Sequence, residues 1–237
     1  MEGSDCLFKR ERHVRIATIL QSLDAGILKS HGCLFGGGTA IVLSHDEYRE
    51  SLDIDFICSD WAGYRSLRQI LTGKKGLRAI ERRGMPLNPV AELRADQYGI
   101  RTLLKVGETE IKFEIIHEGR ILLEPAHENH QICGIATLVP LDMAACKLLA
   151  NSDRWADSSV YCRDIIDLAM MDLSSQQLKK ALSKASGAYG AAVGKDLKKA
   201  IKRLEENPGR LDDCMDALKM TSVPKALLWS KIRVLRF

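Results

Sequence analysis

The sequence predicts an α/β (α+β) fold over residues 1–139, followed by a helical C-terminal half. Two observations predict the first half: a glycine-rich turn at Gly36-Gly37-Gly38, and an apolar strand at 52–58 that carries Asp53 and Asp55. The third observation is that every segment after Pro140 has helical periodicity. We therefore expect two domains, at 1–139 and 140–237.

The first elements follow from apolar spacing and from turn residues. Residues 8–30 carry apolar side chains at helical intervals and predict one amphipathic helix that ends near Gly32. A strand at 33–36 then leads into the glycine turn and a helix at about 39–46. The strand at 52–58 is followed by a helix at 61–72, which Gly73 closes.

The later elements begin with a β-hairpin. Residues 99–106 and 110–117 alternate on either side of Gly107-Glu108. A short strand at 132–138 precedes Pro140, which can open a helix in its first turn. The expected helices then lie at roughly 141–151, 158–171, 175–186, 190–206, 209–219 and 224–234.

The charge of the chain is nearly balanced. Thirty-five basic and 31 acidic residues give a net charge of +4. The overall charge therefore does not by itself indicate a nucleic-acid partner. The basic excess is local, at Lys74, Lys75, Arg78, Arg82 and Arg83. This run is either a solvated surface or a patch that meets a triphosphate or a polyanion such as RNA. It lacks interleaved aromatic residues for base stacking.

The cysteines and the apolar runs bear on the cellular compartment. Seven cysteines, at 6, 33, 58, 133, 146, 162 and 214, form no C-x-x-C pair, which favours reduced thiols over disulfides or zinc. No apolar run approaches the ~20 residues that cross a bilayer, and arginines interrupt the N-terminus. We expect a cytoplasmic protein with no membrane partner.

The aspartate pair predicts a cation site. Alternate strand residues share a face, so Asp53 and Asp55 project together about 7 Å apart, whereas Leu52, Ile54 and Phe56 face the core. Carboxylates beside a core are disfavoured unless a cation or a hydrogen-bond donor neutralises them. An isolated Asp-x-Asp would more often be a charged strand edge, but here it follows a glycine turn.

The glycine turn predicts a phosphate site. Gly37 and Gly38 permit positive φ and a close backbone approach, and Thr39 stands where a helix can begin. Amides at a helix start attract phosphate. Alone, this pattern is more often a tight turn; beside Asp53 and Asp55 it indicates phosphate binding next to a metal site.

These two motifs resemble the nucleotidyltransferase superfamily, in which a Gly-Gly or Gly-Ser turn precedes Asp-apolar-Asp-apolar. The form Gly-Gly-Thr-Ala followed by Arg49-Glu50-Ser51-Leu52-Asp53-Ile54-Asp55 is similar to AbiEii/AbiGii-type toxins of bacterial type IV toxin–antitoxin systems. The matching motifs span residues 34 to about 168. The resemblance implies a nucleotidyltransferase-fold mixed sheet with flanking helices, followed by a helical bundle that completes the nucleotide site.

The resemblance also implies a reaction. A nucleoside monophosphate would move from an NTP to an acceptor hydroxyl with release of pyrophosphate, aided by two Mg²⁺ or Mn²⁺ ions. Asp53 and Asp55 would hold these ions with a third carboxylate, for which we choose Glu114 and keep Glu110 as the alternative. Gly37, Gly38 and Thr39 would bind the phosphates. Arg49 and Ser51 would brace the carboxylate strand beside the nucleotide.

The same resemblance extends into the helical half. The family has a helix lysine, then an arginine, then a basic-Asp-x-x-Asp-Leu signature, which Lys147, Arg154 and Arg163-Asp164-Ile165-Ile166-Asp167-Leu168 match. Lys147 would neutralise the β- or γ-phosphate, with Arg163 and Asp164 also in the nucleotide-binding site. Asp164 and Asp167 would orient Lys147, Arg154 or Arg163. The alternatives are a lysine that extends to solvent and aspartates in surface salt bridges.

These motifs do not identify the molecule that accepts the nucleotide. Family likeness implies addition to tRNA or another translation component, with a cognate antitoxin protein as partner. The alternatives are a small-molecule acceptor, as in antibiotic-modifying nucleotidyltransferases, and an inactive nucleotide-binding module. His127-Glu128-Asn129-His130 does not have the spacing of a zinc motif.

Overall fold

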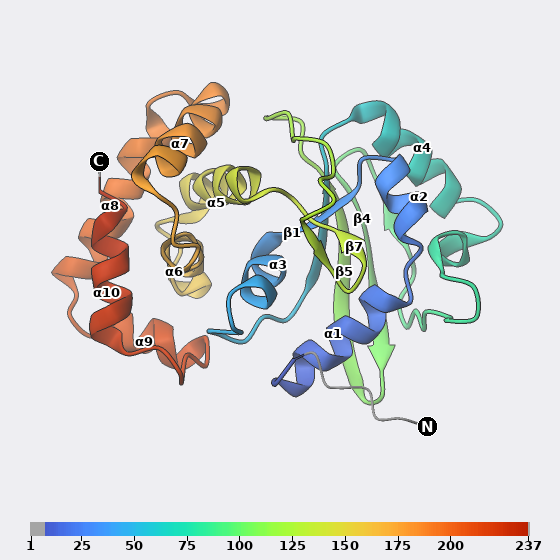
Figure 1. Ribbon diagram of the computed structural model, residues 1–237, viewed down its shortest axis with the longest axis horizontal. Coiled ribbons are helices and arrows are strands. Elements are labelled where there is room, and N and C mark those ends of the chain that lie inside the picture. Colours follow the sequence, from blue (N-terminus) through green and yellow to red (C-terminus); the bar gives the residue numbers. More distant parts are fainter. Residues whose placement is uncertain (1–7, 237) are drawn as a thin grey trace. The chain divides into compact units, whose positions relative to one another are not determined.

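The structure, a computed structural model, describes residues 8–236 and divides into two compact units (Figure 1). The sheet unit contains the described residues up to Glu47 together with Ser51–Val139. The helical unit contains Tyr48–Glu50 and the described residues from Pro140 onward. The chain thus passes from the sheet unit into the helical unit for three residues, Tyr48–Glu50, and then returns to the sheet unit.

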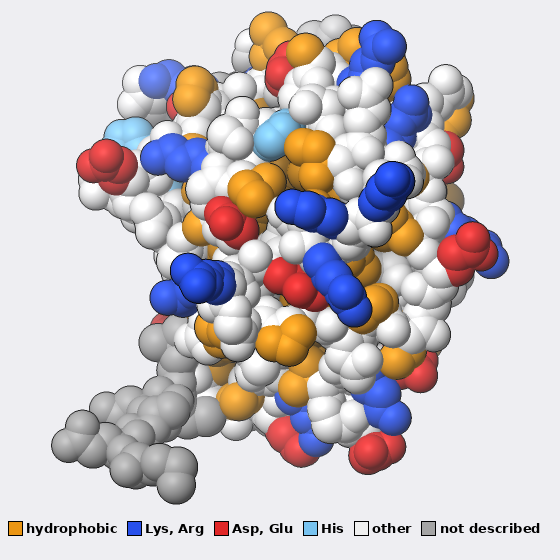
Figure 2. Space-filling view, turned by 90° about the vertical axis from the view of Figure 1, so that its right-hand side faces the viewer, with side chains coloured by type: hydrophobic (Ala, Val, Ile, Leu, Met, Phe, Trp, Pro, Cys, Tyr) orange, Lys and Arg blue, Asp and Glu red, His pale blue; other side chains and the backbone are white. Residues whose placement is uncertain are grey.

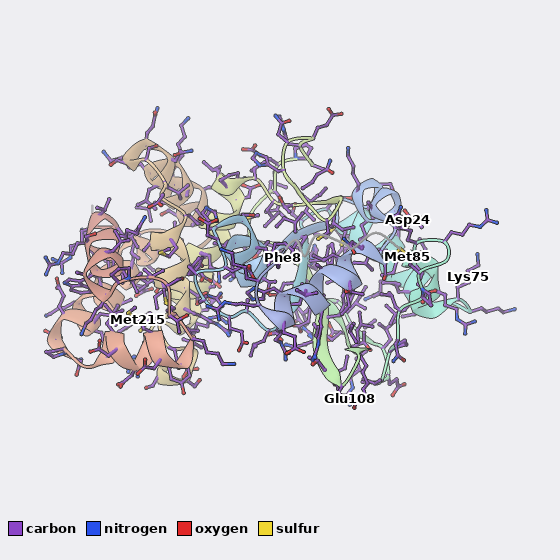
Figure 3. All side chains as sticks on the ribbon, turned by 60° about the horizontal axis from the view of Figure 1, so that its bottom comes forward. Phe8, Asp24, Lys75, Met85, Glu108 and Met215 are labelled. Carbon is purple, nitrogen blue, oxygen red and sulfur yellow. The ribbon has the colours of Figure 1, made fainter. Side chains whose placement is uncertain are left out.

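The five-stranded sheet has the order β1-β2-β5-β4-β3. Its strands are β1 (Leu34–Gly36), β2 (Ile54–Cys58), β3 (Arg94–Ala95), β4 (Gly99–Val106) and β5 (Thr109–His117). The β2 and β5 strands are parallel, and the other neighbours are antiparallel. The β4–β5 hairpin turns at Gly107 and Glu108, as predicted, and Figure 3 labels Glu108 at its tip. The predicted mixed α/β fold class is confirmed.

The core of the sheet unit is built on three rings. Phe56 lies between Phe35 and Phe113, with ring centroids 5.6 Å from each, and all three side chains are fully buried. Alternation along β2 explains this, because Ile54 and Phe56 share the inward face. The expectation that Leu52 joins them was wrong: Leu52 is 47% exposed, because β2 begins only at Ile54.

Helices α1 (Glu11–Gln21) and α2 (Ala25–Ser30) replace the single helix predicted over residues 8–30. The break has a local cause. Asp24 accepts a hydrogen bond from the backbone N–H of Ile27 at 2.9 Å and so caps the start of α2. Its own N–H donates to Ile80 O at 2.8 Å, which diverts the chain out of α1. Aspartate favours this capping position.

Three further helical segments belong to the sheet unit: α3 (Gly37–Ser44), α4 (Trp61–Leu71) and the 3₁₀ helix η1 (Gly76–Ile80). Figure 1 shows α2 and α4 together on one side of the strands and α3 close to β1. Asp60 caps α4 by accepting from Gly63 N at 2.7 Å. Helices α3 and α4 follow the spans predicted at about 39–46 and 61–72 closely, whereas η1 lies in the basic run, for which no helix was predicted.

The strand predicted at 132–138 is instead a small hairpin of β6 (Gln131–Ile132) and β7 (Ile135–Ala136). Cys133 and Gly134 form its turn with φ of 52° and 78°. Positive φ at both central residues is what a two-residue hairpin turn requires. One continuous strand was therefore the wrong prediction.

The helical unit contains α5 (Pro140–Arg154), the 3₁₀ helix η2 (Ser158–Val160), α6 (Arg163–Met170), α7 (Ser175–Tyr189), α8 (Ala192–Glu206), α9 (Arg210–Ala217) and α10 (Lys225–Val234). The predicted helix at 158–171 is interrupted, because Tyr161 and Cys162 have φ of 49° and 51°. Helix α5 packs against α6, α7 and α8 (Figure 1). Glu50 joins this unit through its N–H, which donates to Leu218 O at 2.9 Å.

Two sequence-based expectations concern cysteines and membranes. The cysteines of the described chain, at 33, 58, 133, 146, 162 and 214, are free thiols. Cys6 lies outside the described residues. Within residues 8–236 no helix combines the length and the apolar character needed to cross a bilayer.

We predict that Phe56→Ala destabilises the sheet unit by about 3–5 kcal/mol, because it removes the ring between two buried aromatic neighbours. Leu52→Ala, on the exposed segment before the same strand, should change the free energy of unfolding by less than about 0.5 kcal/mol. Urea denaturation followed by circular dichroism checks both. Equal losses in the two variants would contradict this description of the core.

Candidate functional site

The two aspartates lie at the start of β2. Asp53 directly precedes the strand and Asp55 is its second residue. Asp55 is in register with Gly36 of β1 on one side and with Glu114 of β5 on the other. Register partners in a sheet project from the same face. Asp55 and Glu114 therefore share a face, with the end of β1 beside them.

The glycine turn lies against the Asp55 carboxylate. Gly37 has φ of +67°, and a Cβ atom at this position would lie 2.5 Å from Asp55 Oδ2. Any side chain would collide with the carboxylate, and an L-residue would also be strained at this φ. Gly37 is the first residue of α3, so the amides of the first helical turn start beside Asp55.

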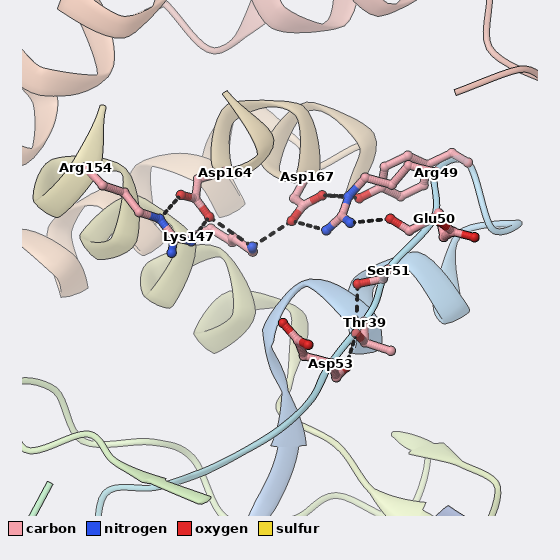
Figure 4. A network of polar contacts seen from close by, with 10 residues as sticks. Thr39, Arg49, Glu50, Ser51, Asp53, Lys147, Arg154, Asp164 and Asp167 are labelled. Carbon is pink, nitrogen blue, oxygen red and sulfur yellow. Dashed lines mark hydrogen bonds and ion pairs between the residues drawn. The ribbon is translucent and has the colours of Figure 1, made fainter. Parts of the chain in front are cut away.

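Thr39 and Ser51 fix the backbone of Asp53 (Figure 4). Their hydroxyls are 2.8 Å apart, and Thr39 Oγ1 also donates to Asp53 O. Both side chains are buried. These contacts favour the bracing role that we expected for Ser51. The direct phosphate contact predicted for the Thr39 hydroxyl stays a prediction, and it would require the hydroxyl to leave these partners.

Glu114 has partners of its own. Its carboxylate accepts from Arg101 Nε at 2.9 Å and pairs with Lys112 Nζ at 2.6 Å. Its predicted role as a metal ligand therefore remains a prediction, and binding would have to displace these cations. Glu110, the alternative, lies nearer the hairpin turn, opposite Lys105.

The residues fit a divalent cation through two carboxylates. Among residues 8–236, no three His, Cys, Asp or Glu side chains gather in a group that could hold a metal ion. Mg²⁺, however, commonly uses one or two protein carboxylates and takes its other oxygens from water and substrate phosphate. Asp53 and Asp55 offer the hard oxygen donors that this mode requires.

A buried polar cluster forms in the helical unit around Asp167, which is fully buried (Figure 4). Arg49 donates Nε and Nη2 to the two carboxylate oxygens at 2.7 and 2.9 Å. Tyr48 OH donates to Oδ1 at 2.6 Å, and Lys147 Nζ lies 2.6 Å from Oδ2. We call Tyr48, Arg49, Lys147, Arg154, Asp164 and Asp167 the Asp167 cluster.

Asp164 completes the cluster. It accepts from Lys147 Nζ at 3.0 Å and from Arg154 Nε and Nη2 at 2.7 and 2.8 Å. Lys147 and both aspartates are buried, so a solvent-facing lysine and surface salt bridges are both excluded. The aspartates hold Lys147 and Arg154, as expected, whereas Arg163 is half-buried at the start of α6. The phosphate contact predicted for Lys147 and the nucleotide binding predicted for Arg163 and Asp164 stay predictions.

The cluster sets the charge state of its carboxylates. Burial acts to raise the pKa of Asp167, but the charges of Arg49 and Lys147 outweigh it and hold the pKa well below its usual range. The pKa of Asp164 is lowered for the same reason by Lys147 and Arg154. Burial raises the pKa of Tyr48, so its hydroxyl stays a donor.

Sequence analysis missed several residues of these networks, among them Tyr48 and His13. Tyr48 donates to Asp167, and its only signal was an aromatic residue beside Arg49. His13, in the sheet unit, contacts Glu47 Oε1 through Nδ1 at 2.7 Å and accepts from Ser51 N at 3.0 Å through Nε2. Its signal was a histidine on the buried face of the first helix, three residues before Ile16.

We predict that Asp167→Asn destabilises the helical unit by about 3–5 kcal/mol at pH 7, because Arg49 and Lys147 would be buried without their full counter-charge. The folded pKa of Asp167 is depressed, so its contribution is fully present above the unfolded pKa of about 3.9 and is lost as pH falls toward the folded value. Urea denaturation from pH 7 to pH 3 should therefore show the difference shrinking only below about pH 4.

The matched control is Asp212→Asn, which removes a carboxylate that is 52% exposed and paired with Lys225. This surface pair should contribute at most about 1 kcal/mol. An Asp167→Asn variant that is no less stable than this control would contradict the role of the cluster.

We predict that Gly37→Ala costs about 1–2 kcal/mol for the positive φ and a further 1–3 kcal/mol, roughly, for the collision with Asp55. Gly107→Ala is the control, since Gly107 has φ of +57° but open space where its Cβ would lie. Urea denaturation of the two variants separates the strain from the collision. Equal losses of stability would show that Gly37 does not press against Asp55.

Comparison with known proteins identifies the family. A family model described as "Nucleotidyl transferase AbiEii toxin, Type IV TA system" matches residues 19–229. Comparison with curated proteins gives no match.

Two solved structures share the fold. One, from H. pylori, is described as a candidate nucleotidyltransferase; it is 14% identical, has a TM-score of 0.51, and the alignment covers 96% of each chain. The other is JHP933 from Helicobacter pylori, at 16% identity and a TM-score of 0.50, with 95% of this chain and 92% of that chain covered. With a glycine turn against the strand of Asp53 and Asp55, and a family match over most of its length, the chain belongs to the AbiEii nucleotidyltransferase toxin family of type IV toxin–antitoxin systems.

Proposed function

We propose that this nucleotidyltransferase moves a nucleoside monophosphate from an NTP to a hydroxyl of an RNA acceptor and releases pyrophosphate, with a divalent cation bound by Asp53 and Asp55. The observation that carries the proposal is the packing of Gly37 against Asp55 at the start of α3. This packing brings helix-start amides, which attract phosphate, to a pair of metal-binding carboxylates.

Each residue of this site has a physical role. The cation, when bound, would offset charge on the phosphate oxygens and lower the pKa of the acceptor hydroxyl. The Gly37 and Gly38 amides lie in the first turn of α3, where the helix offers them no carbonyl partner, so they are available to phosphate oxygens. Thr39 and Ser51 hold the Asp53 backbone and so fix where the carboxylate pair lies.

A basic surface of the sheet unit supports an RNA acceptor. Exposed cations follow one another along α4, η1 and the segment after it; we call this set the basic surface: Arg65, Lys74, Lys75, Arg78, Arg82 and Arg83. Figure 2 views the molecule from the side on which α4 lies in Figure 1 and shows many Lys and Arg side chains there. Figure 3 labels Lys75 at the outer end of this unit. Phosphate contacts by such cations dominate the affinity for nucleic acids.

An aromatic group lies on the same helix. Trp61 opens α4, is 46% exposed, and has its ring centroid 4.9 Å from that of His117. Exposed aromatic rings beside cations stack nucleic-acid bases. The sequence run at 74–83 lacks such rings, whereas Trp61 lies four residues before Arg65 on α4 and so shares a helix face with that cation.

The family implies the remaining partner. Type IV toxin–antitoxin membership implies a cognate antitoxin as well as a nucleotide substrate. We place the reaction in the cytoplasm, with tRNA as the acceptor class and Mg²⁺ or Mn²⁺ as the cation.

We predict that Asp53→Asn and Asp55→Asn each lower nucleotide transfer at least about 100-fold, because each removes a charged oxygen ligand. The assay incubates purified protein with each α-³²P-labelled NTP, Mg²⁺ or Mn²⁺, and total tRNA. The control is Asp216→Asn, at an exposed position of α9, which should retain full transfer.

The outcomes of this assay differ in meaning. Label on RNA with the wild type and the control alone supports the proposal. Wild-type activity in either Asp53→Asn or Asp55→Asn would overturn the site. If the wild type consumes NTP but no RNA is labelled, the acceptor is a small molecule and not RNA.

We predict that Lys74→Ser/Lys75→Ser/Arg78→Ser weakens tRNA binding and lowers the slope of log affinity against log salt by roughly 2, since each lost phosphate contact to a single strand accounts for about 0.7. Filter binding between about 50 and 200 mM salt measures the slope. Lys179→Ser/Lys180→Ser/Lys198→Ser removes the same charge from exposed positions on α7 and α8. Equal slopes in both triple variants would rule out the basic surface.

A further inference from the structure

Two cysteines of the helical unit have no role in the proposed transfer. Cys162 is half-buried, occupies the N-cap position of α6 and has φ of +51°. Cys214 lies in α9 and is fully buried. They are 52 residues apart along the chain (214 minus 162), so only the fold brings them together.

The face of α9 that carries Cys214 packs over the turn before Cys162. Arg210 and Cys214 are four residues apart on α9 and therefore share a helix face. Arg210 Nη2 donates to Ser158 O at 2.8 Å, which fixes this face against the 158–162 turn. The Cys214 side chain is close enough to Cys162 for its thiol to favour the Cys162 thiolate by donating toward that sulfur.

Two arginines surround this pair with positive charge. Arg203 donates to Trp155 O and to Ser158 Oγ, each at 3.2 Å, and so lies along the same turn. Arg210 Nε is buried and has no hydrogen-bond acceptor among the described residues. A buried N–H without an acceptor is costly, and a thiolate at Cys162 would stabilise this charge.

The environment favours the thiolate of Cys162. The hydrogen bond from Cys214, with the charges of Arg210 and Arg203, lowers the pKa of Cys162 to about 6 against the opposing effect of burial. The pKa of Cys214 is raised, chiefly because its proton is held in that hydrogen bond. Burial raises the pKa of Cys133, which is also half-buried.

Access to Cys162 is provided by a small pocket. Its lining includes Asn151, Trp155, Val160 and Cys162. Asn151 Nδ2 is buried and has no partner in the described chain, so the pocket also offers a hydrogen-bond donor. Cys162 and Asn151 thus line the same pocket, which brings a thiol and a hydrogen-bond donor together.

We propose that Cys162 is a site of reversible oxidation by hydrogen peroxide or an organic hydroperoxide, and that Cys214 resolves the product to an intramolecular disulfide. In the first step the Cys162 thiolate attacks one peroxide oxygen, the O–O bond breaks, and Cys162 sulfenic acid and hydroxide form. In the second step the Cys214 sulfur attacks the sulfenic sulfur, the S–O bond breaks, and water leaves with the thiol proton. Peroxide is thus reduced and the two thiols are oxidised.

The first test is the pH profile of alkylation in the wild-type protein. Iodoacetamide labelling, followed for each cysteine peptide by mass spectrometry from pH 5 to pH 8.5, compares Cys162 with Cys133. A lower thiol pKa also lowers the intrinsic nucleophilicity of the thiolate, so the contrast is largest in mild acid. At about pH 6 we expect Cys162 to react roughly tenfold faster than Cys133.

The shape of the profile decides the outcome. The rate at Cys162 should level off near pH 7, whereas the rate at Cys133 should keep rising about tenfold per pH unit to pH 8. A Cys162 rate that rises in parallel with that of Cys133 would overturn the proposal, since no wild-type thiolate would then be stabilised.

The second test is peroxide treatment of the same protein. We expect a mass loss of two hydrogens and a Cys162–Cys214 cross-linked peptide, both reversed by dithiothreitol. In Cys214→Ser protein, Cys162 should instead be trapped as its dimedone adduct. A cross-link involving Cys133 but not Cys162, or no change in mass while free thiols in solution are oxidised, would refute the assignment.

Discussion

The carboxylate of Asp167 is fully buried, and the helical unit depends on how its charge is balanced. A buried carboxylate without partners is strongly unfavourable, so Arg49 and Lys147 must stay beside it. Arg49 lies 118 residues before Asp167 along the chain, and Lys147 lies on the preceding helix α5. The ion pairs therefore decide that Tyr48–Glu50 belong to the helical unit while Glu47 and Ser51 belong to the sheet unit.

This assignment bears on the carboxylate strand, because only three residues separate Arg49 from Asp53. On the sheet side, His13 contacts Glu47 and Ser51, the two residues that flank Tyr48–Glu50. Ser51 then contacts Thr39, and Thr39 donates to Asp53 O. The position of Asp53 is thus fixed within the sheet unit by buried hydrogen bonds.

The local geometry of the motifs could be predicted from the sequence because its signals are local, whereas the roles predicted for their residues stay predictions. The glycine turn, the alternation around Asp55 and the spacing of Asp164 and Asp167 each follow from a few neighbouring residues. The partners of those residues could not be predicted in this way. Tyr48 contacts Asp167, and Arg49 contacts the same carboxylate, only because segments more than 100 residues apart along the chain are packed together.

The element boundaries show the same limit. The break between α1 and α2 depends on Asp24 capping one helix while its N–H bonds Ile80 in a later segment. The β6–β7 turn depends on positive φ at Cys133, and the residue type at this position does not indicate that conformation. Leu52 lies before the first residue of β2, so strand alternation does not apply to it, and its carbonyl accepts from Arg12 Nη2 at 3.0 Å. The break at Asp24 thus arose where a tertiary contact overrode a local pattern, and the β6–β7 turn arose from a backbone conformation that the pattern does not reveal.

The most direct measurement is a double-mutant cycle between Arg49→Gln and Asp167→Asn. Urea denaturation, followed by the fluorescence of Trp155 and Trp229 in a Trp61→Phe background, reports on the helical unit. A buried charge pair predicts that the two single losses together exceed the loss in the double variant by at least about 1.5 kcal/mol. Losses that add to within about 0.5 kcal/mol would contradict the claim that Asp167 holds Arg49.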